Sequence, residues 1–138
     1  MIETLTFART YRYDIRKSGI TLPATLTSGD KSIECEAKLD SGSSLCVFPR
    51  RYGEELDFDI ESGLHRRIST ATGGLDAYGH WLTIQALGFE YEAMVFFAKD
   101  HGYNRNILGH HGWIDRLRLG LIAYDGKLYF SDYNDPLE

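Results

Sequence analysis

Cysteine is scarce in this sequence, which contains only Cys35 and Cys46 among its 138 residues. Two cysteines cannot form the disulfide framework of a small secreted domain, and these two do not form the CxxC pair typical of metal and redox sites. Both lie inside apolar segments that have the character of strands. We therefore predict that both are buried free thiols.

The sequence also lacks a basic tract and a long apolar run. Its 15 Lys and Arg residues are outnumbered by 20 Asp and Glu residues, which gives a net charge of −5. No basic cluster is available to neutralise a run of phosphates, so nucleic acid is not expected as a partner. No stretch reaches the ~18 apolar residues of a membrane span, and the first residues lack the features of a secretory signal. We expect a cytoplasmic protein without a membrane partner.

Helical periodicity is rare, and alternation of apolar and polar residues takes its place. Residues 20–26 and 33–39 alternate in this way on either side of Ser28-Gly29-Asp30. This pattern predicts a hairpin with one apolar, buried face. Residues 45–48 are continuously apolar, as expected for a strand buried on both sides. The chain length and its 43% hydrophobic content suit a single compact domain.

The remaining segments extend this pattern of short strands. Residues 4–15 predict a first strand or a terminal arm, and residues 49–56 a short helix with Pro49 in its first turn. Further predicted elements are strand arms at 65–72 and 78–86 around Gly73-Gly74, a strand at 89–97 after Gly88, a helical turn at 113–117, and a hairpin at 119–130 closed by Asp125-Gly126. Short strands with frequent glycine predict an all-β closed barrel with one or two short helices.

One loop combines a carboxylate with buried surroundings. The second strand of the first hairpin runs directly into Asp40-Ser41-Gly42-Ser43-Ser44, and the apolar segment 45–48 follows. Asp, Ser and Gly are common turn residues, so the tripeptide alone predicts only a turn. Apolar strands on both sides are unusual for an exposed turn. The sequence therefore predicts a carboxylate held in a tight loop between two core strands.

Three features in order resemble the retropepsin-like aspartic peptidases: this loop, a glycine-tipped hairpin near Gly73, and Asn106-Ile107-Leu108-Gly109 before a short helix. The resemblance covers residues 20–131, leaving an N-terminal arm at 1–19 and a C-terminal tail at 132–138. It implies an acid-protease barrel of the retropepsin type. It also implies that Asp40 is catalytic, that residues 70–77 are a flap, and that Ile107, Leu108 and Gly109 pack beneath the catalytic loop. The flap tip would consist of Thr72, Gly73, Gly74 and Leu75, with two glycines and an apolar residue as in retroviral flaps.

The implied reaction requires two carboxylates. One is ionised and takes a proton from the attacking water, while the other is protonated and polarises the scissile carbonyl. The chain has one copy of the motif, so the resemblance implies a homodimer in which each subunit supplies one Asp40. Ser41, Gly42 and Ser43 would support the loop, with Ser41 donating its hydroxyl across the dimer. The implied substrate is a peptide or protein, and no cofactor is needed.

The sequence differs from the retroviral pattern at several positions. His110-His111-Gly112 follow Gly109 where retroviral enzymes usually have Arg-Asn, and the arm before Ile20 is longer than the minimal form. The contacts that hold the dimer together are therefore left open. Asp76 lies close to the flap tip, where a charge could repel acidic peptides, so the substrate preference is left open.

The sequence offers little support for a metal site or for a nucleophilic serine or cysteine. His101, His110 and His111 could suggest zinc, but adjacent histidines point in different directions and no third ligand lies at a suitable spacing, so no metal is expected. The serines of the loop lack a GxSxG elbow, and Cys46 lies in a buried run, so neither kind of residue is expected to be a nucleophile.

Two non-enzymatic alternatives stay open. The first is a peptide-binding module of the same fold, in which Asp40 braces the loop by accepting backbone hydrogen bonds. The second is a structural β-barrel that contains the motif by chance, and it predicts a monomer.

Overall fold

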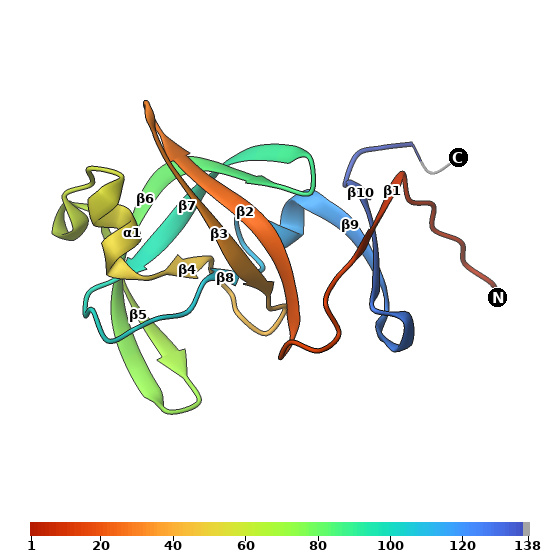
Figure 1. Ribbon diagram of the computed structural model, residues 1–138, viewed down its shortest axis with the longest axis horizontal. Coiled ribbons are helices and arrows are strands. Elements are labelled where there is room, and N and C mark those ends of the chain that lie inside the picture. Colours follow the sequence, from red (N-terminus) through yellow and green to blue (C-terminus); the bar gives the residue numbers. More distant parts are fainter. Residues whose placement is uncertain (137–138) are drawn as a thin grey trace.

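The computed structural model describes residues 1–136 and consists mainly of strands (Figure 1). The strands are β1 (Arg9–Arg12), β2 (Ile20–Ser28), β3 (Lys31–Leu39), β4 (Val47–Phe48), β5 (Leu64–Thr70), β6 (Gly73–Ala86), β7 (Phe89–Ala98), β8 (Ile107–Leu108), β9 (Leu117–Ile122) and β10 (Lys127–Asp132). The helical elements are α1 (Arg50–Glu55) and the 3-10 turns η1 (Ile60–Ser62), η2 (Ile114–Arg116) and η3 (Ala123–Asp125). The predicted all-β class with short helices is confirmed. None of the helices among these residues is long and apolar enough to cross a membrane.

The larger sheet has seven strands in the order β2-β3-β8-β4-β7-β6-β5. Because β2 also pairs with β6, the sheet returns on itself in a ring-like arrangement, and β5 extends beyond it. The predicted first hairpin is confirmed, with β2 and β3 antiparallel from Ile20 opposite Leu39 to Ser28 opposite Lys31. Its alternating apolar residues face the core, as the strand period of two requires.

The smaller sheet has the order β1-β10-β9 and lies at the right of Figure 1. The N-terminal segment contributes β1, which pairs antiparallel with β10 from Arg9 opposite Phe130 to Arg12 opposite Lys127. Strand β9 pairs only with β10 among the described residues, so its other edge is free. The predicted tail begins at the end of β10, and its residues 137–138 lie outside the described part of the chain.

The apolar side chains form two clusters. The main core draws on several strands, on η1 and on the segment just before η2. Its largest fully buried side chains are Leu22, Leu26, Phe48, Ile60, Ile84, Phe97, Leu108, Trp113 and Leu128. A second cluster contains Val47, Ala77 and Phe96, with Leu45, Ile68, Leu75, Met94 and Tyr103 packed against them. Neighbouring residues of β7 belong to different clusters, so the two clusters lie on opposite faces of this strand. The second cluster becomes the floor of the cleft described below.

Two predicted turns are wrong. Gly73 and Gly74 do not form the turn between β5 and β6, because Thr70 pairs with Gly73 and the tip consists of residues 71–72. Both glycines belong to β6, and Gly73 has a positive φ of 130°. Asp125-Gly126 is not a two-residue turn either, because Ile122 pairs with Lys127 across a four-residue loop that contains η3.

Both cysteines are free thiols, and their predicted burial holds for only one of them. Cys46 is fully buried, whereas Cys35 is only partly buried on β3, where its side chain packs against the main core. The short helix α1 is confirmed, with Pro49 at its N-cap position. The helical turn expected at 113–117 is confirmed as η2.

Candidate active site

The Asp40 loop (residues 40–44) is fixed by hydrogen bonds that its backbone N–H groups donate. Asp40 N–H donates to the carbonyl of Leu108 at 3.0 Å, and Ser43 N–H donates to the carbonyl of Asp40 at 3.1 Å. Gly42 N–H donates to Asp40 Oδ1 at 2.9 Å. The Asp40 side chain is therefore held by its own loop, at a position that is only partly buried.

The Ile107–Gly109 segment lies directly against this loop. Strand β8 pairs in parallel with the end of β3, with Leu39 opposite Leu108, and it pairs antiparallel with β4 through Val47. His110 N–H donates to the carbonyl of Ser43 at 2.8 Å, which continues the contact past β8. A Cβ atom at Gly109 would overlap the carbonyl oxygen of Leu45, so this close approach requires glycine.

Cys46 lies behind the loop and is not placed to act as a nucleophile. Its thiol sulfur accepts a hydrogen bond from Gly109 N–H at 3.3 Å. Burial raises the pKa of the Cys46 thiol to about 11, so the thiol is protonated near neutral pH. Ser43 Oγ donates to the carbonyl of Leu45 at 2.8 Å. Within residues 1–136, no hydrogen bond joins the hydroxyl of an Asp40-loop serine to a histidine ring; the His110 and His111 contacts with Ser43 and Ser44 are between backbone groups.

A cleft of about 510 Å³ opens beside the Asp40 loop. It brings together three regions that are far apart in the sequence: the loop, the β5–β6 hairpin, and residues 103–107. The lining residues are Asp40, Gly42, Ser43, Val47, Ile68, Ser69, Thr70, Ala71, Leu75, Tyr103, Arg105 and Ile107. Of the four residues expected at the flap tip, only Leu75 lines the cleft. Thr72, Gly73 and Gly74 are exposed at the end of the hairpin.

The Asp76 carboxylate is paired with His65 and Arg67 on the face of the hairpin opposite the cleft. Asp76 Oδ1 lies 2.9 Å from His65 Nε2, and Asp76 Oδ2 accepts a hydrogen bond from Arg67 at 2.9 Å. The hydrogen bond with His65 is the main cause that lowers the pKa of the Asp76 carboxyl, and the charge of Arg67 contributes. Arg67 and Asp76 are a cross-strand pair, and the next pair, Ile68 and Leu75, faces the cleft. The Asp76 carboxylate is therefore paired and lies on the face of the hairpin opposite the cleft, so it is not placed to repel an acidic peptide there.

Sequence reasoning missed two polar residues of the cleft, Tyr103 and Arg105. Burial is the main cause that raises the pKa of the Tyr103 phenol to about 12, and the negative charge of Asp40 contributes. The phenol therefore stays protonated near neutral pH and offers an O–H donor. The only signal in the sequence was their position just before Asn106-Ile107.

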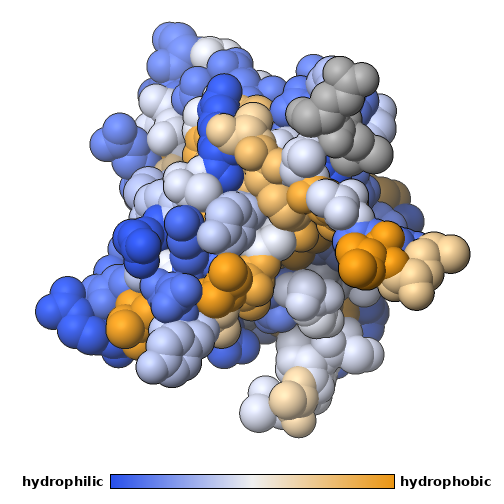
Figure 2. All heavy atoms as spheres, turned by 90° about the vertical axis from the view of Figure 1, so that its right-hand side faces the viewer, coloured by the Kyte–Doolittle hydropathy of each residue, from blue (hydrophilic) through white to orange (hydrophobic). Residues whose placement is uncertain are grey.

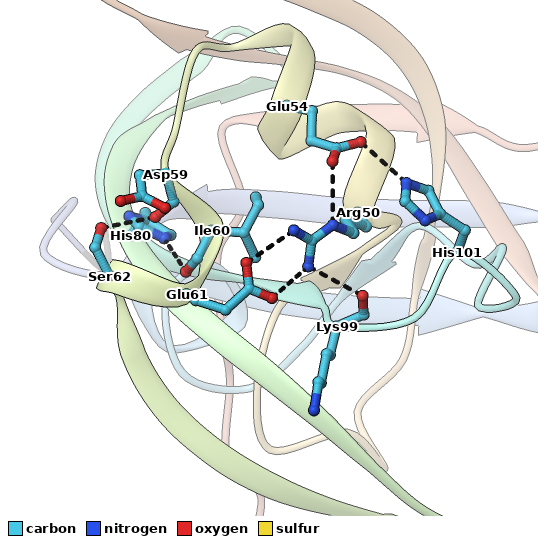
Figure 3. Close-up of polar contacts among 9 residues, drawn as sticks. All are labelled: Arg50, Glu54, Asp59, Ile60, Glu61, Ser62, His80, Lys99 and His101. Carbon is cyan, nitrogen blue, oxygen red and sulfur yellow. Dashed lines mark hydrogen bonds and ion pairs between the residues drawn. The ribbon is translucent and has the colours of Figure 1, made fainter.

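Two histidines, His80 and His101, take part with Arg50 in contacts that connect surface segments. Figure 3 shows Arg50 of α1 bound to Glu54 at 3.1 Å and to Glu61 at 2.6 Å, while His101 Nε2 lies 3.0 Å from Glu54. His80 Nε2 lies 2.9 Å from the carbonyl oxygen of Ile60 in the same view. These contacts tie α1 to η1 and to the loop after β7. In residues 1–136, no group of three or more His, Cys, Asp or Glu side chains is placed to hold a metal ion.

Comparisons with known proteins agree with this geometry at the level of the fold. No protein-family model matches the sequence, and no curated protein matches it. Among solved structures, the chain is similar to the crystal structure of a retropepsin-like aspartic protease from Rickettsia conorii, with a TM-score of 0.66. The match covers 89% of this chain and 97% of that one, at 16% sequence identity. The chain therefore has a retropepsin-like fold, as the order of its motifs indicated.

Proposed function

We propose that the protein is an aspartic endopeptidase, active as a homodimer in which each subunit supplies one Asp40. The observation that supports this proposal best is the position of Asp40. Its loop lies between core strands, its backbone is fixed by Leu108, and the residue lines a cleft bordered by the β5–β6 hairpin. A carboxylate at the wall of a peptide-sized cleft is suited to activate water.

The chemistry uses only side chains and water. In a pair of carboxyl groups that share one proton, the ionised member takes a proton from water as the water attacks the scissile carbonyl. The protonated member donates a hydrogen bond to the carbonyl oxygen and stabilises the negative charge that develops on it. One chain contributes one such loop, so the second carboxyl group comes from a second copy related by a two-fold axis.

The surface that fits a second copy lies on the other side of the Asp40 loop. Ser41 does not line the cleft but a separate apolar hollow of about 190 Å³, whose other lining residues are Ile20, Leu39, Ile114, Leu119, Gly120, Leu121 and Leu128. Figure 2 shows hydrophobic side chains gathered on the face of the molecule that contains the smaller sheet. Leu121 and Ile122 are 51% and 43% exposed there, on β9, an edge strand of this sheet among the described residues. A copy docked on this face brings two Asp40 loops together.

Activity is expected to depend on this face. Leu121→Asp places a charge in the proposed interface and should dissociate the dimer, because a desolvated unpaired charge is costly. The subunit itself should stay folded, since the side chain is half exposed in the monomer. Leu64→Asp is the matched control, because Leu64 is 45% exposed on β5 of the other sheet.

Sedimentation velocity over a range of concentrations, combined with a peptide-cleavage assay, tests this expectation. Wild-type protein should lose specific activity on dilution as the dimer dissociates, Leu121→Asp should be monomeric and inactive, and Leu64→Asp should stay dimeric. Concentration-independent activity from a demonstrated monomer would contradict a site shared between subunits.

One contact favours a second candidate function, a peptide-binding module. Gly42 N–H donates to Asp40 Oδ1, so the carboxylate also braces its own loop. In such a module the cleft would hold an extended peptide without cutting it. Peptides that bind the wild-type protein and are recovered intact across the acidic to neutral range would favour this function over hydrolysis.

A further inference from the structure

Arg105 stands apart from the other arginines of the chain. Within residues 1–136, every other arginine side chain donates at least one hydrogen bond to a carboxylate, a carbonyl or an amide oxygen. The Arg105 guanidinium has no such partner among these residues, and the residue is exposed. It lines the same cleft as Asp40. A guanidinium has five N–H donors in a planar fork that matches a carboxylate, so Arg105 is free to bind one.

The walls around Arg105 are apolar. Val47, Ile68, Leu75 and Ile107 line the same cleft, and the first three belong to the second hydrophobic cluster. A hydrophobic side chain of a bound peptide would extend this cluster and lose its own contact with water. The cleft thus offers an apolar pocket with one cation beside it.

Within residues 1–136, Asp40 is the only acidic residue that lines the cleft beside this cation. Asp76, the nearest acidic residue of the hairpin in sequence to Leu75, is paired with His65 and Arg67 on the opposite face. Arg66 lies two residues before Ile68 on β5, so it shares the face of the strand that borders the cleft and adds positive charge there. An anionic side chain would therefore meet attraction beyond the Asp40 loop.

We infer that the cleft selects peptides in which an apolar residue lies next to an acidic one, with the acidic side chain bound by Arg105. This inference rests on the proposed function and names its substrate class. The apolar residue occupies the pocket formed by Val47, Ile68 and Leu75, and the Glu or Asp beside it pairs with the guanidinium. In a two-fold dimer the second Arg105 offers the same contact on the other side of the scissile bond.

Three peptides that differ only in having Glu, Gln or Lys beside a fixed apolar residue test the inference. Wild-type kcat/KM for the Glu peptide should exceed that for the Gln peptide by about fivefold or more, because charge-assisted hydrogen bonds in a partly enclosed cleft are stronger than surface pairs. Arg105→Gln should remove this preference, and Arg105→Glu should favour the Lys peptide. Added salt should weaken the wild-type preference.

Arg16→Gln is the control variant, because the Arg16 side chain is 87% exposed and lies outside the cleft. Its peptide preference should equal that of the wild type. A wild-type enzyme with no preference for the Glu peptide, or a preference that survives in Arg105→Gln, would overturn the inference.

Binding measured without turnover separates this inference from the proposed function. Fluorescence anisotropy of the same labelled peptides on Asp40→Asn protein should show the same order of affinity, again lost in Asp40→Asn/Arg105→Gln. If the wild type cleaves nothing while this order of binding holds, the inference stands and the peptidase proposal fails. If the peptides are cleaved without charge preference, only the inference fails, and if they are neither cleaved nor bound, both fail.

Discussion

Asp40→Asn is expected to lower peptide cleavage by about 10³-fold or more while the fold is retained. Asn has the size and one carbonyl acceptor of Asp but cannot ionise, so the pair loses the base that activates water. The carbonyl of the amide can still accept the hydrogen bond from Gly42 N–H, which keeps the loop in place. Removing the repulsion between two neighbouring carboxylates should also leave the dimer at least as stable near neutral pH.

The control for this substitution is Asp30→Asn. Asp30 is exposed in the turn at the opposite end of the same β2–β3 hairpin, so its loss of charge should not affect cleavage. Activity is measured with a quenched peptide library, and the fold by circular dichroism and sedimentation. Wild-type turnover by Asp40→Asn would rule out Asp40 as the catalytic carboxylate. The wild-type rate should follow a bell-shaped profile on the acidic side of neutrality, because the pair needs one protonated and one ionised member.

Gly109→Ala is expected to reduce the free energy of unfolding by about 3 kcal/mol or more. The added methyl group would overlap the carbonyl oxygen of Leu45 and lie 2.9 Å from that of Ser43. Both obstacles are backbone atoms, so no side-chain rotation can make room. Either β8 moves away from the Asp40 loop or the loop itself shifts, and both movements break hydrogen bonds that hold Asp40.

Gly102→Ala is the matched control, because Gly102 lies in the loop before β8 and a Cβ there would meet no heavy atom within 4 Å. Urea denaturation of the two variants gives the comparison. Gly102→Ala should unfold close to the wild-type midpoint, and Gly109→Ala should unfold at much lower urea and lose cleavage. Equal stability of Gly109→Ala and the wild type would mean that Ile107–Gly109 is not packed against the loop as described.

The sequence predicted the elements that local patterns determine. Alternating residues gave the β2–β3 hairpin, Pro49 marked the start of α1, and Gly88 marked the turn before β7. The turn of the β5–β6 hairpin was misplaced because two consecutive glycines suggest a turn, whereas the observed turn depends on which residues pair across the strands. That register places Thr70 opposite Gly73 and depends on the whole sheet.

Only some residues of the candidate site could be predicted from the sequence, for a similar reason. Asp40 and the Ile107–Gly109 segment could be named because their order matched a known pattern. Tyr103 and Arg105 belong to no motif, and only the folded chain shows that they line the cleft with Asp40. Ser41 lines the apolar hollow, whereas Asp40 lines the cleft. This difference between two neighbouring residues also depends on tertiary structure.

Mixed dimers test the shared site most directly. Wild-type and Asp40→Asn subunits are refolded together at a fixed total concentration, and cleavage is measured as the wild-type fraction is varied. If both Asp40 residues are required, only dimers with two wild-type subunits are active, so an equal mixture should retain about a quarter of the activity. A linear dependence, with about half of the activity in the equal mixture, would show that each subunit works alone and would contradict the shared carboxylate pair.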